Sequence, residues 1–334
     1  MSQDKKELKN LFNRIGGAML VFLAAYTLFC GSAAVLSENV TQITYSTDAY
    51  VWTELLNAIA YIAAFSIPIW FFLAISKRKT VEPFGLSLTI GEKNTGLLTT
   101  AMMFLGTATC FAASYVNSIL FPISEEAAEI YFSSDIRGEY VLVLMFISTA
   151  IVPAFVEELL FRGMVLSSVL PYSEGGAILV SALLFGLMHQ TPFQFFYATA
   201  IGVVLGIIRV KTGSIWVGVL VHFCNNFLSV VQTYLLGCYD TYTGNVIYTI
   251  ITLSVILLAL VLGIILYTKT KKRHGIKTVD QIGFYGKHQD ASQIFPLNSE
   301  EREVYKAFFS PTMILFIIFC GLTMLSTANM IGGV

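Results

Sequence analysis

AFVEELLFR, residues 154–162, places two adjacent glutamates and an arginine inside a long apolar run. Residues 140–156 before the glutamates and residues 163–173 after the arginine contain no Asp, Glu, Lys or Arg. An ionised side chain at the centre of a membrane-spanning helix costs about 2.5 kcal/mol or more. Three such groups within six residues therefore require partners or a function inside the protein.

Helical spacing separates the three charged residues. Glu158 and Arg162 are four residues apart with the glutamate first, which is the favourable order for an ion pair within one helix. Glu157 points about 100° away, so Arg162 does not serve it. Glu157 must find a partner on another helix, face water or be protonated. A purely structural interpretation is a buried polar cluster that orders a helix bundle.

The composition indicates a polytopic membrane protein. Of the 334 residues, 56% are hydrophobic and only 12% are charged, which does not fit a soluble domain. The five cysteines lie in or beside apolar runs and form no CxxC pair. We interpret them as small apolar residues, not as disulfides or a zinc site.

The apolar runs predict an all-α transmembrane bundle of about eight or nine spans. The fifth is short for a full crossing and Pro192 separates it from the sixth, so 176–209 is either two spans or a re-entrant hairpin. The expected helices are 15–37, 53–75, 97–120, 140–169, 176–190, 193–209, 213–236, 246–268 and 309–331.

The basic residues predict which side each loop faces. Cytoplasmic loops of membrane proteins carry an excess of Lys and Arg. With the N-terminus cytoplasmic, 18 of the 20 Lys and Arg fall on the cytoplasmic side, and the exceptions are Arg137 and Arg162. This sorting was not used to choose the spans, so it supports the predicted topology.

Few strongly polar groups remain within the predicted spans besides the charged triplet. They include His189, and His222 with Asn226 one turn later on the same helix face. A lone histidine in an apolar helix is usually a packing residue, but two histidines with an acid and an amide favour a function. A carboxylate and a histidine can deprotonate water. A second histidine and an amide can stabilise the oxyanion of a tetrahedral intermediate.

These residues fall into three ordered motifs, each on its own predicted helix. The motifs are Glu157-Glu158-x-x-x-Arg162, Phe185-x-x-x-His189 and His222-x-x-x-Asn226. They resemble the motifs of the CAAX-protease and bacteriocin-processing (CPBP, or Abi) intramembrane proteases, the type II CAAX endopeptidases. The resemblance covers residues 151–227.

The resemblance implies a role for each matched residue. Glu157 would be the general base that activates water, and His189 would assist it. His222 and Asn226 would stabilise the oxyanion. The supporting residues would be Glu158, Arg162 and Phe185.

The resemblance also leaves the cofactor open. Members of the family have been described as metalloproteases, and zinc could be held by Glu157, His189 and His222 with water as fourth ligand. The chain has no HExxH pair that fixes a metal, so we prefer a metal-free mechanism with no cofactor.

The resulting division of the chain has six parts. We expect a peptide or membrane-protein substrate in contact with the lipid bilayer, and no nucleic-acid partner. The parts are a cytoplasmic amphipathic N-terminus (1–14), N-terminal transmembrane helices (15–138), a CPBP-like catalytic core (139–236), a transmembrane helix (237–268), a cytoplasmic polar loop that could include an interfacial helix (269–306) and a C-terminal transmembrane helix (307–334).

Two other classes of function remain open from the sequence. A proton-coupled transporter also uses intramembrane Glu, His and Arg, although no inverted repeat is visible. A non-catalytic immunity or scaffold protein could use the same residues only to hold the bundle together. No organelle signal is present, so a multi-pass protein of the bacterial plasma membrane is expected by analogy.

Overall fold

The all-α prediction is confirmed by a computed structural model of the chain. The residues that it describes form helices joined by short connections, and no strand occurs among them. The described residues are 3–43, 47–76, 84–86, 93–120, 139–274 and 299–332.

The helices identify a multi-pass membrane protein. Within the described ranges, seven helices are long and apolar enough to cross a membrane, or eight if the bent pair α12–α13 is one span. The predicted number, eight or nine, counted 176–190 as a span. The helix there, α8, has only 15 residues, about 22 Å at 1.5 Å per residue against a hydrocarbon core of about 30 Å.

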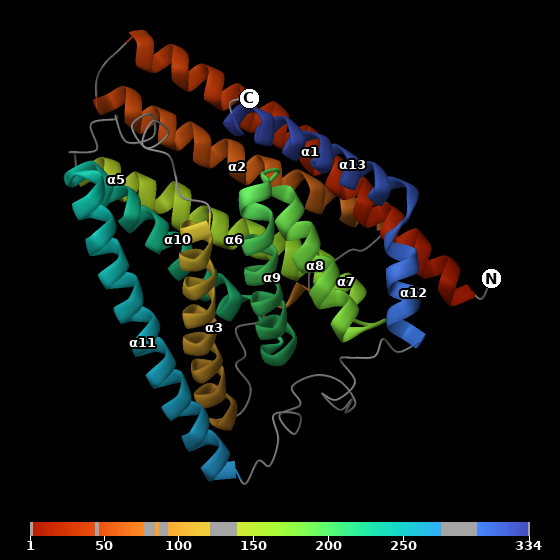
Figure 1. The fold of residues 1–334 in the computed structure, drawn as a ribbon. Helices are drawn as coiled ribbons and strands as arrows, with labels where there is room; N and C mark the ends of the chain where they lie inside the picture. The colour runs from red at the N-terminus through yellow and green to blue at the C-terminus, as the bar shows by residue number, and fades with distance from the viewer. Residues whose placement is uncertain are drawn as a thin grey trace.

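Three helices from the two ends of the chain form one layer (Figure 1). Helix α1 packs along α2 on one side and α13 on the other. One helix, α1, begins at Gln3 and continues through the described part of the predicted N-terminal segment, 1–14, into the first predicted span. Helix also occupies residues 38–43 and 47–52, which lie between the spans predicted at 15–37 and 53–75. The bounds are α1 Gln3–Ile43, α2 Thr47–Ser76 and α13 Pro311–Gly332.

The segment with the two glutamates is a continuous helical path that alternates between α and π geometry. π segments inside α-helices are often found at functional sites. Here two of them flank the short α-helix that carries Glu157 and Glu158. The order is α5 Glu139–Met145, η2 Phe146–Ile151, α6 Val152–Glu158, η3 Leu159–Leu166 and α7 Ser167–Val169.

Local capping signals fix where the next three helices begin. The hydroxyls of Ser173, Thr191 and Ser214 each accept a backbone N–H of the first turn that follows. Gly213 ends the second of these helices in the left-handed conformation (φ 71°), which glycine adopts without strain. The three helices are α8 Glu174–Met188, α9 Pro192–Thr212 and α10 Ile215–Cys238.

The remaining helices complete the bundle. Helix α3 (Lys93–Leu120) packs along α11 (Thr241–His274) and also contacts α9 and α10. The amphipathic helix α12 (Ser299–Phe308) lies where an interfacial helix was expected. Its Glu303 forms an ion pair with Lys5 of α1, with 3.2 Å between Oε1 and Nζ. Most of the predicted 269–306 loop, residues 275–298, lies outside the described residues, as does 121–138.

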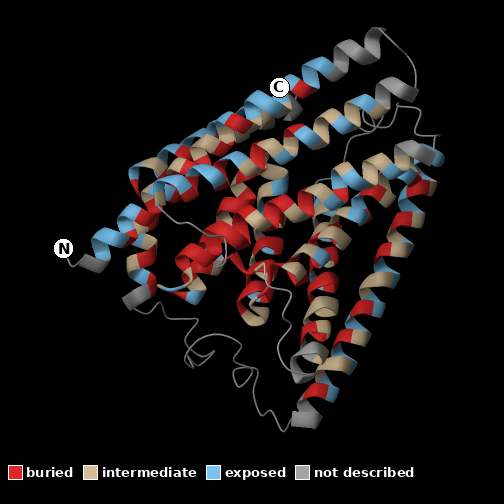
Figure 2. Cartoon of the chain, turned by 180° about the vertical axis from the view of Figure 1, so that it is seen from behind, coloured by how far each residue is buried: buried red, intermediate tan, exposed pale blue. Residues whose placement is uncertain are grey.

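Burial is greatest in the middle of the bundle (Figure 2). Buried residues concentrate on α6 through α10, whereas residues 27–36 of α1 are mostly exposed and the described part of α11 mixes exposed and buried positions. Glycines allow close packing here: a Cβ on Gly202 of α9 would lie 2.9 Å from the Cα of Ala182 in α8. The charged segment is therefore enclosed by other helices and does not face lipid.

We expect Gly202→Ala to lower the melting temperature of the detergent-purified protein. Overpacking of a close helix contact costs about 1–3 kcal/mol. Gly31→Ala in α1 is the matched control, because a Cβ there meets no atom within 4 Å. Gly31→Ala should leave the melting temperature unchanged or raise it, since alanine favours helix. Equal shifts for the two variants would contradict the close α8–α9 packing.

Candidate active site

The three charged residues of the central helix are buried together. Side-chain exposure is 5% for Glu157 and 0% for both Glu158 and Arg162. The ion pair predicted from helical spacing is confirmed, since Arg162 Nη1 donates to Glu158 Oε1 at 2.7 Å. The pair forms although the helix changes from α to π geometry between the two residues.

Arg162 also holds neighbouring helices. Its Nη2 donates to the backbone carbonyl of Gly202 in α9 at 3.0 Å. Its guanidinium carbon lies 4.6 Å from the ring centroid of Phe185 in α8, in a cation–π contact. Arg162 therefore joins the charged helix to α8 and α9 while it compensates Glu158.

His222 of α10 lies between the two glutamates. Its Nδ1 is 3.2 Å from Glu158 Oε1, and its Nε2 is 3.6 Å from Glu157 Oε2. His222 is itself buried. Helix α10 thus supplies the partner that Glu157 was expected to find on another helix.

Glu157 has a second partner, Tyr61 of α2. The Tyr61 hydroxyl donates a hydrogen bond to Glu157 Oε1. The two carboxylate oxygens therefore have different surroundings: Oε1 accepts a hydrogen bond from the Tyr61 phenol, and Oε2 faces the His222 imidazole. Such an arrangement fixes the orientation of the carboxylate.

His189 lies at the tip of the α8–α9 hairpin. It caps the C-terminus of α8, and the next residue, Gln190, has a left-handed backbone (φ 55°) before Thr191 begins α9. His189 Nδ1 is 2.8 Å from the carbonyl of Phe185. Because a carbonyl only accepts, Nδ1 carries the hydrogen, and Nε2 of the neutral ring is the nitrogen that can accept a proton or bind water.

Phe185 packs against both histidines, as expected for a residue beside the site. Its ring centroid is 5.1 Å from that of His189 and 5.5 Å from that of His222, with both pairs edge-to-face. Of the two histidines, His222 is the one that contacts Glu157 in the described part of the chain.

The two asparagines of α10 have different surroundings. Asn226 is half-buried one turn after His222 and has no hydrogen-bond partner in the described part of the chain. Asn225 is buried and accepts from the Ser114 hydroxyl of α3 at 2.9 Å. Asn226 is thus the amide that is free to bind a ligand, while Asn225 connects two helices.

The sequence analysis missed two residues of this site. Tyr61 carries no sequence signal, because nothing in its neighbourhood distinguishes it from the other aromatic residues of the apolar helices. Gly218 lies one turn before His222, and a Cβ there would be 2.9 Å from Glu158 Oε2. The i, i+4 spacing of Gly218 and His222 is a signal that could have identified Gly218 as the space for Glu158.

The residues present do not form a metal site as they stand. A zinc ion needs three protein ligands in a catalytic site. Among the described residues, no group of three or more His, Cys, Asp or Glu side chains lies close enough to hold an ion. The five cysteines are free, as expected, and none belongs to such a group.

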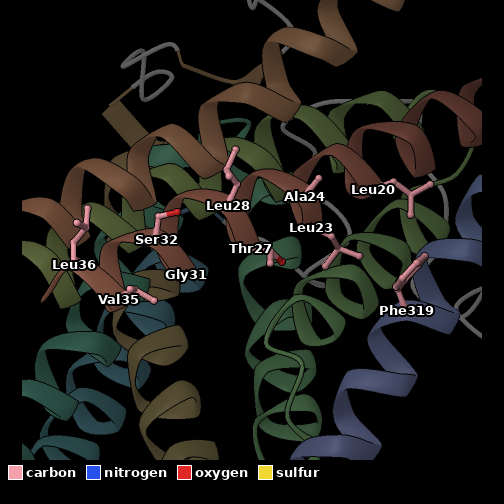
Figure 3. A pocket seen from close by; sticks show the side chains of 10 residues that line it. All are labelled: Leu20, Leu23, Ala24, Thr27, Leu28, Gly31, Ser32, Val35, Leu36 and Phe319. Atoms are coloured by element: carbon pink, nitrogen blue, oxygen red, sulfur yellow. The ribbon is translucent and has the colours of Figure 1, made fainter. Parts of the chain in front are cut away.

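A cavity of about 910 Å³ lies along α1 (Figure 3). Its lining is almost entirely apolar, and Figure 3 shows these α1 side chains along the helix with Phe319 of α13 at one end. None of the glutamates, histidines or asparagines described above lines it. The lining residues are Leu20, Leu23, Ala24, Thr27, Leu28, Gly31, Ser32, Val35, Leu36 and Phe319.

Comparison with known families identifies the segment that holds these motifs. Residues 139–228 match the family model described as type II CAAX prenyl endopeptidase Rce1-like. These residues are therefore similar to an Rce1-like domain. The match confirms the predicted resemblance and supports a protease at the level of the matched family. No curated protein and no solved structure matches the chain. The Rce1-like domain contains both glutamates and both histidines, whereas Tyr61 lies outside it.

We expect Arg162→Met to destabilise the fold strongly, by about 3–5 kcal/mol, because Glu158 would remain as an uncompensated buried charge. Thermal unfolding in detergent and the yield of monodisperse protein would measure this. The double variant Arg162→Met with Glu158→Leu should recover part of the loss. Lys306→Met is the control: its ion pair with Glu303 is exposed, and such pairs contribute about 0–1 kcal/mol. Equal losses for Arg162→Met and Lys306→Met would contradict the buried pair.

Proposed function

We propose that this chain is an intramembrane endopeptidase that hydrolyses a peptide bond with a water molecule activated by Glu157. The observation that carries the proposal is the buried pair of Glu157 and His222, at 3.6 Å, inside an Rce1-like domain. A buried carboxylate next to an imidazole is costly to maintain in a membrane protein, and such groups are characteristic of functional sites.

The first step is the attack of water on the peptide carbonyl. A water held at Glu157 Oε2 passes a proton to the carboxylate, and the hydroxide oxygen bonds to the carbonyl carbon. His189 assists by accepting a hydrogen bond from the same water at Nε2, which its Nδ1 bond to Phe185 leaves available. Glu158 stays ionised beside Arg162 and does not exchange a proton.

The second step is the collapse of the tetrahedral intermediate. The carbonyl oxygen, now negatively charged, accepts hydrogen bonds from His222 and the Asn226 amide, which share one face of α10. Glu157 returns its proton to the amine as the C–N bond breaks. The products are a carboxylic acid and an amine, and Glu157 is again ionised. The acid then passes its proton to the amine or to solvent, which leaves a carboxylate and an ammonium group.

The substrate class follows from the family description. The matched family is described as cleaving CAAX prenyl substrates, so a peptide with a prenylated C-terminal cysteine motif is the first probe. A peptide or membrane-protein substrate without a prenyl group fits the same chemistry. We propose the bacterial plasma membrane as its location, which the absence of an organelle signal supports.

We expect Glu157→Gln to lower cleavage about 100-fold or more while the protein stays folded, because general acid–base catalysis contributes about 10²–10⁴-fold. The assay uses detergent-purified protein and an internally quenched peptide that ends in S-farnesylated Cys-Val-Ile-Met. Membrane peptidomes of cells with wild type and Glu157→Gln would identify other substrates. Glu303→Gln changes a partly exposed glutamate of α12, is the control and should keep full activity.

Two outcomes would contradict the proposal. Equal cleavage by wild type and Glu157→Gln would exclude Glu157 as the base. Identical peptidomes together with an unchanged cellular phenotype would favour the scaffold alternative, in which the buried residues only hold the helices together.

We also propose that turnover needs no metal. Purified protein should contain zinc at well below one ion per chain, measured by mass spectrometry of the metal content. Prolonged treatment with a zinc chelator should leave the cleavage rate unchanged. A stoichiometric zinc content, with activity lost to the chelator and restored by added zinc, would show instead that Glu157, His189 and His222 close around a metal ion.

A further inference from the structure

Tyr61 is the only partner of the Glu157 carboxylate among the described residues that comes from outside the Rce1-like segment. It lies on α2, which packs against α6, η2 and η3 of the central helical path. Its hydroxyl donates to Oε1 of Glu157. The catalytic base proposed above is therefore in contact with a part of the chain to which no role has been assigned.

The ring of Tyr61 is held on two sides by other aromatic rings. It stacks on Phe65 with a centroid distance of 4.6 Å and an interplanar angle of 28°. Tyr26 of α1 meets it edge-on at 6.2 Å and 76°. Phe65 in turn packs against the fully buried Phe22 at 4.8 Å. Packing therefore sets the direction of the Tyr61 hydroxyl before any substrate binds.

The hydrogen bond keeps the carboxylate of Glu157 from closing onto His222. At 3.6 Å, Oε2 and His222 Nε2 are beyond the usual hydrogen-bond distance of about 2.7–3.2 Å. Without the bond from Tyr61, the carboxylate can turn toward the imidazole and form a direct pair. Such a pair would occupy the oxygen that is needed to bind and deprotonate water.

We propose that Tyr61 is a positioning residue of the hydrolase: it fixes Oε1 of Glu157 and so leaves Oε2 available to activate water. This inference rests on the proposed function of Glu157. It assigns α2 a part in the reaction and explains why the aromatic stack of α1 and α2 lies against the glutamate.

The test compares Tyr61→Phe with Tyr26→Phe in the farnesylated-peptide assay. Tyr61→Phe removes one hydroxyl and keeps the stacked ring, while Tyr26→Phe removes a hydroxyl from the same stack that donates no hydrogen bond to Glu157 within the described structure. A hydrogen bond to a charged group corresponds to about 10- to 100-fold in rate. Tyr61→Phe should lower kcat by this factor with KM nearly unchanged, and Tyr26→Phe should alter neither.

A double-mutant cycle provides a readout that does not depend on activity. The melting temperature in detergent is measured for wild type, Tyr61→Phe, Glu157→Ala and the double variant. If the two side chains are bonded, Tyr61→Phe should lower the melting temperature less in the Glu157→Ala background than in wild type, because the hydroxyl has already lost its acceptor.

The outcomes separate the two proposals. The positioning role would be overturned if wild type cleaves the peptide and Tyr61→Phe cleaves it equally fast, or loses no more rate than Tyr26→Phe does. The proposed hydrolase activity would then still stand. Additive melting shifts would overturn the contact itself. If wild type and Glu157→Ala cleave the peptide equally, the proposed hydrolase function of Glu157 is wrong. The role of Tyr61 in that reaction is then wrong as well.

Discussion

The structure depends on the neutralisation of charge inside a membrane protein. A continuous series of contacts runs from the Gly202 carbonyl through Arg162, Glu158 and His222 to Glu157, and ends at Tyr61. Every side chain between the two ends is buried. Because leaving one member unpaired costs about 3–5 kcal/mol, the series fixes how α2, α9 and α10 are placed around the central helix.

The same constraint supplies a chemical asymmetry. Glu158 is paired with Arg162 and packs against Gly218, so its role is structural. Within the described part of the chain, the partners of Glu157 are a phenol and a more distant imidazole, so it retains an oxygen for chemistry. Two adjacent glutamates thus obtain different roles from their environments, which is how one helix can provide both a framework and a base.

Much of the fold was predictable from the sequence, because hydrophobic length and helical spacing are local signals. The Glu158–Arg162 pair followed from an interval of four residues. The failures came from properties that are not local. Helix α8 is short for a span, and helix α1 runs from Gln3 to Ile43, past both ends of the span predicted at 15–37.

The candidate site was predictable to the same extent. Motif spacing indicated which residues of α6, α8 and α10 face inward, but not how the helices rotate against one another. His222, and not His189, therefore proved to be the histidine nearest to Glu157. Tyr61 was not predictable, because tyrosine is common in apolar helices and only the packing of α2 on α6 shows what its hydroxyl meets.

The central claim is that His222 joins the two glutamates within the membrane, and solid-state NMR of the protein in lipid bilayers tests it most directly. With ¹⁵N-labelled histidine and ¹³C-labelled glutamate carboxyls, dipolar recoupling measures nitrogen–carboxyl distances. We expect short contacts between histidine nitrogens and glutamate carboxyl carbons, which correspond to the nitrogen–oxygen distances of 3.2 and 3.6 Å. These contacts should be present in wild type and in His189→Gln and should be lost in His222→Gln. Contacts that persist in His222→Gln, or no short contact in wild type, would contradict it.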